Sequence, residues 1–121
     1  MQGKSGIWID HKEAFVVFAE SLPDSEKHVR FADHQSSSHA GAAEDHRDRQ
    51  HSAHLGKFYD EVISHVRDAE SIFIFGPGEA KGELGKRLAA KGLGERIVGV
   101  ETVDKLTGHQ IAAKVRQHYQ L

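Results

Sequence analysis

Five of the ten histidines in this chain of 121 residues fall in one polar stretch. The stretch covers residues 34–54, HQSSSHAGAAEDHRDRQHSAH, and contains no large apolar side chain. Its histidines are His34, His39, His46, His51 and His54. Histidine is the commonest metal ligand in proteins, and Glu44, Asp45 and Asp48 could add carboxylate oxygens. The histidine spacing matches no closed zinc-ligand set, so we favour a solvated loop that is mobile in the free protein, with no metal or other cofactor.

A glycine-rich turn follows an apolar run over residues 72–75, and a lysine-bearing segment with helical spacing comes next. The turn consists of Gly76, Pro77 and Gly78. A helix that starts here would direct its free amides and the positive end of its dipole at an anion. The dinucleotide fingerprint does not fit, because Lys81 stands where its third glycine should be, and the P-loop pattern fails as well. We interpret the three residues as a strand-to-helix turn and leave open that they hold a nucleic-acid phosphate.

Asp10 suggests a second kind of chemistry, because it ends the first expected strand ahead of a hairpin. Nucleases of the ribonuclease-H-like fold carry their first metal-binding carboxylate at this position. Two-metal catalysis needs several acids within a few ångströms, and the later strand ends offer only Gly76 and the region 101–104. A metal-dependent nuclease using Asp10 is therefore kept as an alternative function.

Positive charge gathers in the carboxyl-terminal third of the chain. Residues 1–79 hold 8 Lys/Arg and 14 Asp/Glu, a balance of −6, whereas residues 80–121 hold 8 Lys/Arg and 4 Asp/Glu, a balance of +4. Such a segment could contact phosphate backbones, or its cations could simply form solvated helix surfaces. The candidate phosphate contacts are Lys81, Lys86, Arg87, Lys114 and Arg116, with Arg47 and Arg49 from the polar stretch.

Hydrophobic periodicity places these residues on one α/β domain over residues 1–121. Two strands around residues 10–12 form a hairpin, and a more exposed third strand surrounds Val29. Later strands cover residues 72–75 and 96–103, the first of them apolar on both faces and so central in the sheet. The expected order is β-β-β-α-β-α-β-α with a mixed sheet.

Three helices are expected, and each has a recognisable signal. Apolar residues at spacings of three and four predict a helix from Leu55 to Val66. The second helix follows the glycine turn and ends at glycines in the range 92–94. Thr107 and Gln110 match a capping box that opens the third helix, whose Ile111, Ala112 and Val115 should face inward.

Composition excludes several classes of protein. Hydrophobic residues make up 38% of the chain and charged residues 28%, which is typical of a globular protein. No apolar run approaches the length of a membrane helix, and the first 15 residues lack the apolar core of a signal peptide. With no cysteine, disulfides and thiolate metal sites are excluded. We expect a cytoplasmic protein without membrane contact.

Four stretches of the chain resemble a known family. They are WIDHKEAFVVF, HLGKFYDEVISHV, SIFIFGPGEAKGEL and IVGVETV. Together, from about Gly6 to Tyr119, they resemble the middle domain of the class-one peptide chain release factor of eukaryotes and archaea and of its relative Pelota, including bacterial relatives. The run Gly76-Pro77-Gly78 followed by Lys81 is the most specific match. The resemblance implies a ribonuclease-H-like fold without nuclease activity, acting on the ribosome near the acceptor end of tRNA.

The resemblance does not extend to the catalytic triplet of the release factors. Their loop before the first helix carries Gly-Gly-Gln, whose glutamine helps water attack peptidyl-tRNA, whereas residues 39–44 here are HAGAAE. Pelota also lacks the triplet and rescues ribosomes by non-hydrolytic binding. We therefore expect a non-enzymatic module that associates with ribosomes or structured RNA, including tRNA. The alternatives are a peptidyl-tRNA hydrolase, the nuclease described above, or a protein-interaction or metal-binding module using the histidines.

Overall fold

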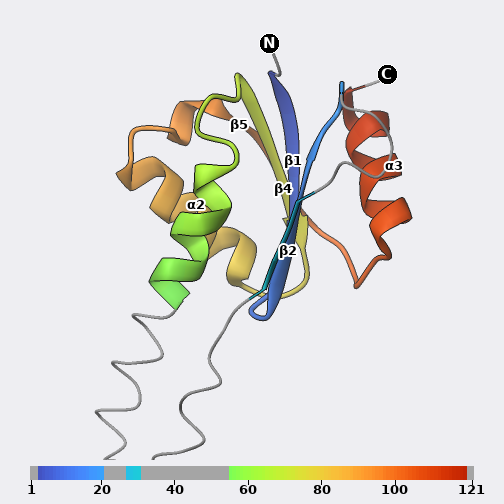
Figure 1. The fold of residues 1–121 in the computed structure, drawn as a ribbon, viewed down its shortest axis with the longest axis horizontal. Helices are drawn as coiled ribbons and strands as arrows, with labels where there is room; N and C mark the ends of the chain where they lie inside the picture. Colours follow the sequence, from blue (N-terminus) through green and yellow to red (C-terminus); the bar gives the residue numbers. More distant parts are fainter. Residues whose placement is uncertain (1–2, 21–26, 31–54, 120–121) are drawn as a thin grey trace, which may run out of the picture.

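In the computed structural model, the described residues form five strands and three helices in the expected order, β-β-β-α-β-α-β-α (Figure 1). The structure describes residues 3–20, 27–30 and 55–119. The elements are β1 (Lys4–Ile9), β2 (Glu13–Phe18), β3 (Lys27–Arg30), a helix over residues 55–64, β4 (Ser71–Gly76), α2 (Ala80–Ala90), a 3-10 turn η2 (Gly94–Arg96), β5 (Ile97–Thr102) and α3 (Gly108–Tyr119).

The strands form one mixed sheet in the order β3-β2-β1-β4-β5. β1 and β2 pair antiparallel, as do β2 and β3, whereas β1, β4 and β5 run parallel. The predicted interior position of the apolar strand is confirmed, because β4 lies between β1 and β5. The middle strand itself is β1, which has buried side chains on both faces.

Alternation along the strands divides the core into two layers. Ile7, Ile72 and Ile74 face the helix 55–64 and α2, which cover one side of the sheet. Trp8, Phe73 and Phe75 face α3 on the other side. Figure 1 shows this arrangement, with the helix 55–64 and α2 together on one face and α3 alone on the opposite face. Parallel crossovers are right-handed, so two successive crossovers in the same direction place their helices on the same face.

Short-range hydrogen bonds explain where the elements begin and end. The carboxylate of Asp10 accepts the backbone N–H groups of Lys12 and Glu13 at 2.7 and 2.8 Å, which closes the β1–β2 hairpin. The predicted capping box is present at α3: the Gln110 N–H donates to the Thr107 hydroxyl, and the Thr107 N–H donates to the Gln110 side chain.

The second helix ends at glycine, as predicted. Gly92 has a φ of +81°, and its N–H donates to the carbonyl of Ala89. The Leu93 N–H donates to the carbonyl of Leu88. This pair of bonds satisfies the last carbonyls of α2 and reverses the chain toward β5.

Several sequence predictions fall outside the described residues. They concern the predicted mobility of the chain from His34 to about His51, the candidate contacts Arg47 and Arg49, the turn before β3, and any continuation of β3 beyond Arg30. No helix within the ranges given above is long and apolar enough to cross a lipid bilayer. The ribonuclease-H-like designation stays a prediction.

Candidate functional site

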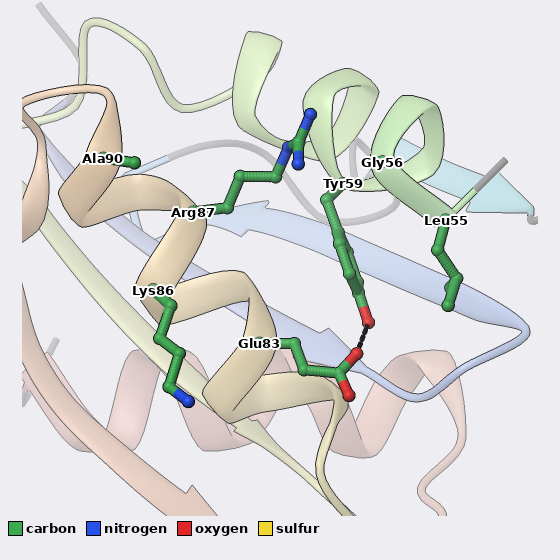
Figure 2. Close-up of a pocket in the computed structure, with 7 residues that line it drawn as sticks. All are labelled: Leu55, Gly56, Tyr59, Glu83, Lys86, Arg87 and Ala90. Carbon is green, nitrogen blue, oxygen red and sulfur yellow. Dashed lines mark hydrogen bonds between the residues drawn. The ribbon is translucent and has the colours of Figure 1, made fainter. Parts of the chain in front are cut away.

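A cleft of about 490 Å³ lies between the helix 55–64 and α2 (Figure 2). Its lining residues are Leu55, Gly56, Tyr59, Glu83, Lys86, Arg87 and Ala90. A smaller cleft of about 300 Å³ is formed where the same two helices end, and it is lined by Ile63, Arg67, Lys91 and Leu93. Both clefts therefore combine apolar side chains with lysine and arginine.

An ion pair between the two helices holds one of these cations in place. Arg87 donates from Nε to Asp60 Oδ1 at 2.6 Å and from Nη2 to Oδ2 at 3.0 Å, and Lys91 Nζ lies 3.4 Å from Oδ1. The hydrogen bonds from Arg87 are the main reason that the pKa of Asp60 falls to about 2. Both Arg87 and Asp60 keep about two fifths of their side-chain surface exposed. Arg87 is therefore a fixed positive charge on the wall of the cleft.

A hydrogen bond closes the other end of the cleft. Figure 2 shows the Tyr59 hydroxyl donating to the Glu83 carboxylate across the gap between the helices. Burial, and then the hydrogen bond and charge of Glu83, raise the pKa of Tyr59 above its ordinary value, so the phenol stays protonated at neutral pH. His11 Nε2, from the β1–β2 hairpin, lies 3.4 Å from the same carboxylate. This group joins the hairpin to both helices.

The two predicted lysines on α2 differ in whether their ammonium groups already have a partner. Lys86 is exposed on the cleft wall, and no residue that the structure describes forms an ion pair with its ammonium group. The ammonium of Lys81 donates to the carbonyl of Gly78 at the start of α2. Lys86 is thus open to a ligand, whereas Lys81 already stabilises the turn.

The backbone of the Gly76-Pro77-Gly78 turn requires glycine at positions 76 and 78. Gly76 has a φ of +152°, and a Cβ atom there would lie 2.1 Å from the carbonyl oxygen of Ile9. Gly78 has a φ of +66°, in the left-handed region. At the start of α2 stands Glu79, whose side chain makes no capping hydrogen bond. Its negative charge opposes an anion at that helix end, so these contacts account for the turn, and an anion site there stays a prediction.

The structure separates the basic residues of the carboxyl-terminal third. Lys114 and Arg116 lie on α3, on the opposite face of the sheet from α2 (Figure 1). Lys114 pairs with Glu101 at 2.8 Å, and its ammonium lies 6.0 Å from the centre of the Phe75 ring. Arg116 is half-buried. The segment that appears as one basic block in the sequence is therefore two surfaces in the fold.

The carboxylate of Asp10, the candidate metal ligand, stabilises the β1–β2 hairpin. Its Oδ1 accepts the two amides described above. Over residues 3–20, 27–30 and 55–119, no three His, Cys, Asp or Glu side chains come together in a group that could hold a metal ion. The described part of the fold therefore does not supply the converging carboxylates that two-metal catalysis requires.

Sequence reasoning missed a cluster on the α3 face of the sheet. Glu13 Oε1 lies 2.7 Å from His28 Nε2, and Glu13 Oε2 lies 3.2 Å from Lys105 Nζ. Burial alone would raise the pKa of Glu13, but hydrogen bonds and charge from His28 and Lys105 lower it overall. The His28 ring stacks on Phe15 at 4.2 Å. The sequence gives little signal for this cluster, because Lys105 is far from Glu13 along the chain.

Comparison with known proteins supports the fold. No protein-family model matches the chain, and no curated protein sequence matches it significantly. The similar solved structures include Thermoplasma acidophilum Pelota, with a TM-score of 0.55 and 15% identity over 87% of this chain, and Archaeoglobus fulgidus Pelota, with a TM-score of 0.56 and 14% identity over 96%. The matched regions are 29% and 33% of those chains, so this chain spans about a third of their length. At this identity the likeness concerns the fold alone.

Proposed function

We propose that this domain is a non-enzymatic module that binds ribosomes or structured RNA and acts in translation, in the manner of termination and rescue factors. Two lines of support agree. The four stretches of sequence that resemble the release factor and Pelota family occupy the hairpin, the helix 55–64, the β4–α2 turn and β5. Independently, the fold is similar to two Pelota structures.

The observation that carries the proposal is the cationic wall of the two clefts. Lys86 and Arg87 line the larger cleft, and Arg67 and Lys91 line the smaller one. An RNA backbone presents a phosphate at every nucleotide, so a row of exposed cations along one groove suits it better than a single small ligand. The counter-charges are Asp60, which fixes Arg87 and Lys91 by ion pairs, and Glu83, which lines the larger cleft. The four cations exceed these two acids, so the walls of the clefts keep a positive surplus.

The non-enzymatic part of the proposal rests on the sequence. The position of the release factors' Gly-Gly-Gln is occupied by residues 39–44, HAGAAE. Hydrolysis of peptidyl-tRNA needs a positioned water and a group that stabilises the developing oxyanion. A carboxylate at Glu44 would repel that oxyanion.

Binding is tested with the double variant Arg67→Glu, Lys86→Glu, which reverses one exposed cation in each cleft. Arg87 stays unchanged, because its substitution would also break the ion pair with Asp60. We expect weaker binding of fluorescent tRNA in anisotropy titrations, and a log–log salt slope that is shallower by about 0.7 to 0.9 for each lost phosphate contact. The matched control is Lys4→Glu, Lys27→Glu, which makes the same charge change at exposed positions on β1 and β3.

The second pair, Lys114→Glu with Arg116→Glu, tests the α3 face in the same assay. Loss of binding in this pair alone would move the interface from the cleft to α3. Co-sedimentation of the wild-type domain with ribosomes at low salt is the wider test. If the wild-type domain binds neither ribosomes nor tRNA, the proposal is refuted.

The alternative hydrolase is tested on ribosomes that carry labelled peptidyl-tRNA. We expect no release above background. Release by the wild-type domain that is lost in His39→Ala or His46→Ala would show that the histidine stretch is catalytic, and would refute the non-enzymatic function.

A further inference from the structure

The wall of the larger cleft carries one group that phosphate binding does not explain, the carboxylate of Glu83. Contacts to phosphate use hydrogen-bond donors and positive charge, which Lys86 and Arg87 supply. A negative charge in the same wall repels phosphate, and the Glu83 side chain keeps 43% of its surface exposed. This carboxylate therefore lowers the affinity for an RNA backbone unless the ligand brings a hydrogen-bond donor to it.

The two carboxylate oxygens of Glu83 differ in their contacts. Oε1 accepts the hydroxyl of Tyr59 and lies 3.4 Å from Nε2 of His11. Among the residues that the structure describes, none donates a hydrogen bond to Oε2. Figure 2 shows this second oxygen turned away from Tyr59. Because Tyr59 is itself buried, its hydroxyl holds the carboxylate in place and leaves Oε2 as an acceptor for a ligand.

A cation lies one helical turn away from this acceptor. Glu83 and Lys86 are three positions apart on α2, both line the cleft, and both are exposed. Side chains at this spacing are neighbours, with Cβ atoms about 5 to 6 Å apart. The structure shows no ion pair between these two side chains. A ligand that satisfies both groups must therefore present an anionic oxygen and a hydrogen-bond donor close to each other.

The backbone of RNA offers this combination at every nucleotide. The 2′-hydroxyl is attached to the ribose carbon next to the one that carries the 3′-phosphate, and DNA lacks it. The amino groups of the bases lie farther from the phosphate, and in a paired stem they bond the opposite strand. The wide, shallow minor groove of an RNA stem displays the 2′-hydroxyls to a protein. The 2′-hydroxyl is thus the donor that suits the spacing of Glu83 and Lys86.

We propose that the larger cleft recognises the sugar of RNA: Glu83 Oε2 accepts a hydrogen bond from a ribose 2′-hydroxyl, while Lys86 binds the adjacent phosphate. This inference rests on the proposed function and deepens it, because it makes the domain selective for RNA over nucleic acids without that hydroxyl. A site that hydrogen-bonds a hydroxyl rejects an analogue that lacks it, since the acceptor is then left without a partner. Glu83 is the residue that determines this specificity.

The first test changes the ligand and leaves the protein as it is. A fluorescent RNA hairpin is compared with its 2′-fluoro form, which has the same sequence and charge but no 2′-hydroxyl proton. The wild-type domain should bind the RNA about fivefold more tightly in anisotropy titrations, the typical net effect of one hydrogen bond. The log–log salt slopes of the two ligands should be equal, because the phosphate contacts are the same.

The second test changes the acceptor. In Glu83→Gln, the amide oxygen can replace Oε1 as the partner of Tyr59 and His11, and the amide nitrogen then replaces Oε2 and cannot accept. The variant should bind both hairpins equally, and it should bind the 2′-fluoro form more tightly than wild type does, since a negative charge has been removed. The matched control is Glu79→Gln, which makes the same charge change at the exposed start of α2, outside the cleft lining. It should keep the fivefold preference, and circular dichroism confirms that each variant is folded.

A competition assay distinguishes an RNA strand from a free nucleotide. Adenosine 3′-monophosphate carries the same hydroxyl and phosphate, and with a single phosphate contact it should displace the hairpin only at millimolar concentration. Displacement at micromolar concentration would assign the cleft to free nucleotides and overturn the proposal.

The remaining outcomes separate this inference from the proposed function. If the wild-type domain binds the RNA and 2′-fluoro hairpins equally, recognition of the sugar is refuted, whereas RNA binding itself stands. A preference for RNA that persists in Glu83→Gln would place the hydroxyl contact elsewhere and also refute the role of Glu83. If the wild-type domain binds neither hairpin, nor tRNA and ribosomes, the proposed function fails together with this inference.

Discussion

Replacing Asp60 by asparagine should destabilise the domain in a pH-dependent way. The substitution keeps the shape of the side chain and removes the charge that Arg87 contacts at 2.6 and 3.0 Å. A tenfold change in proton affinity corresponds to about 1.4 kcal/mol, so a pKa lowered from its ordinary 3.8 to about 2 sets an upper limit of about 2.4 kcal/mol. The Asp60 side chain is 42% exposed, and solvent screening reduces the expected effect to about 1 kcal/mol.

The pH dependence has a definite sign. Because folding lowers the pKa of Asp60, its contribution to the free energy of unfolding is complete above about pH 4 and is lost as the pH falls toward 2. The free energy of unfolding of the wild-type domain should therefore exceed that of Asp60→Asn by about 1 kcal/mol at pH 7, which corresponds to about 4 °C in melting temperature. The two proteins should become equal near pH 2.

Urea unfolding followed by circular dichroism at pH 7, 4, 3 and 2.5 measures this difference. Glu61→Gln is the control, since Glu61 is the adjacent exposed carboxylate and should change stability by less than about 0.5 kcal/mol. A difference between wild type and Asp60→Asn that stays constant from pH 7 to 2.5 would refute the ion pair as its cause. Equal stabilities at pH 7 would refute the estimated magnitude.

Four further substitutions test the β4–α2 turn, α2, the α3 cap and the charge of the cleft. Gly76→Ala should cost about 3 kcal/mol or more in the free energy of unfolding, because its Cβ would lie 2.1 Å from the Ile9 carbonyl oxygen at a φ of +152°. Gly82→Ala, in α2 with nothing within 4 Å of the new Cβ, should instead stabilise by about 1 kcal/mol, and urea titration of both variants checks the contrast. Thr107→Ala removes the α3 cap and should cost about 1 kcal/mol, measured as a lower melting temperature. Asp60→Asn should bind tRNA more tightly than wild type in anisotropy titrations, because the substitution removes a negative charge from the cationic cleft. Unchanged or weaker binding would count against that cleft as the RNA site.

Interactions between residues close in the chain could be predicted because their geometry is local. The capping box at Thr107, the hairpin turn at Asp10 and the glycine end of α2 each join residues at most five positions apart. Helical spacing in the same way indicated the buried stripe that contains Val62 and Ile63. These signals were sufficient for the order of elements and for a mixed sheet.

Part of the candidate site was also predictable from the sequence. Lys86 and Arg87 were identified by charge, and the structure places both on the wall of one cleft. Their partners were not identified, since Asp60 is 27 positions from Arg87 and nothing in the local sequence relates them. Only the packing of the helix 55–64 against α2 brings these two side chains together.

The sequence by itself determined which segments become strands and helices and which side of each is apolar, because those properties depend on neighbours within a few residues. It did not determine which face of the sheet each helix covers. That choice depends on the strand order, in which β4 and β5 continue the sheet on one side of β1, so that the helix 55–64 and α2 share a face. The tertiary structure therefore divides the basic carboxyl-terminal third between two faces and leaves β5 at an edge. The physical reason is that long-range strand pairing sets these positions, whereas charge and periodicity are properties of the chain alone.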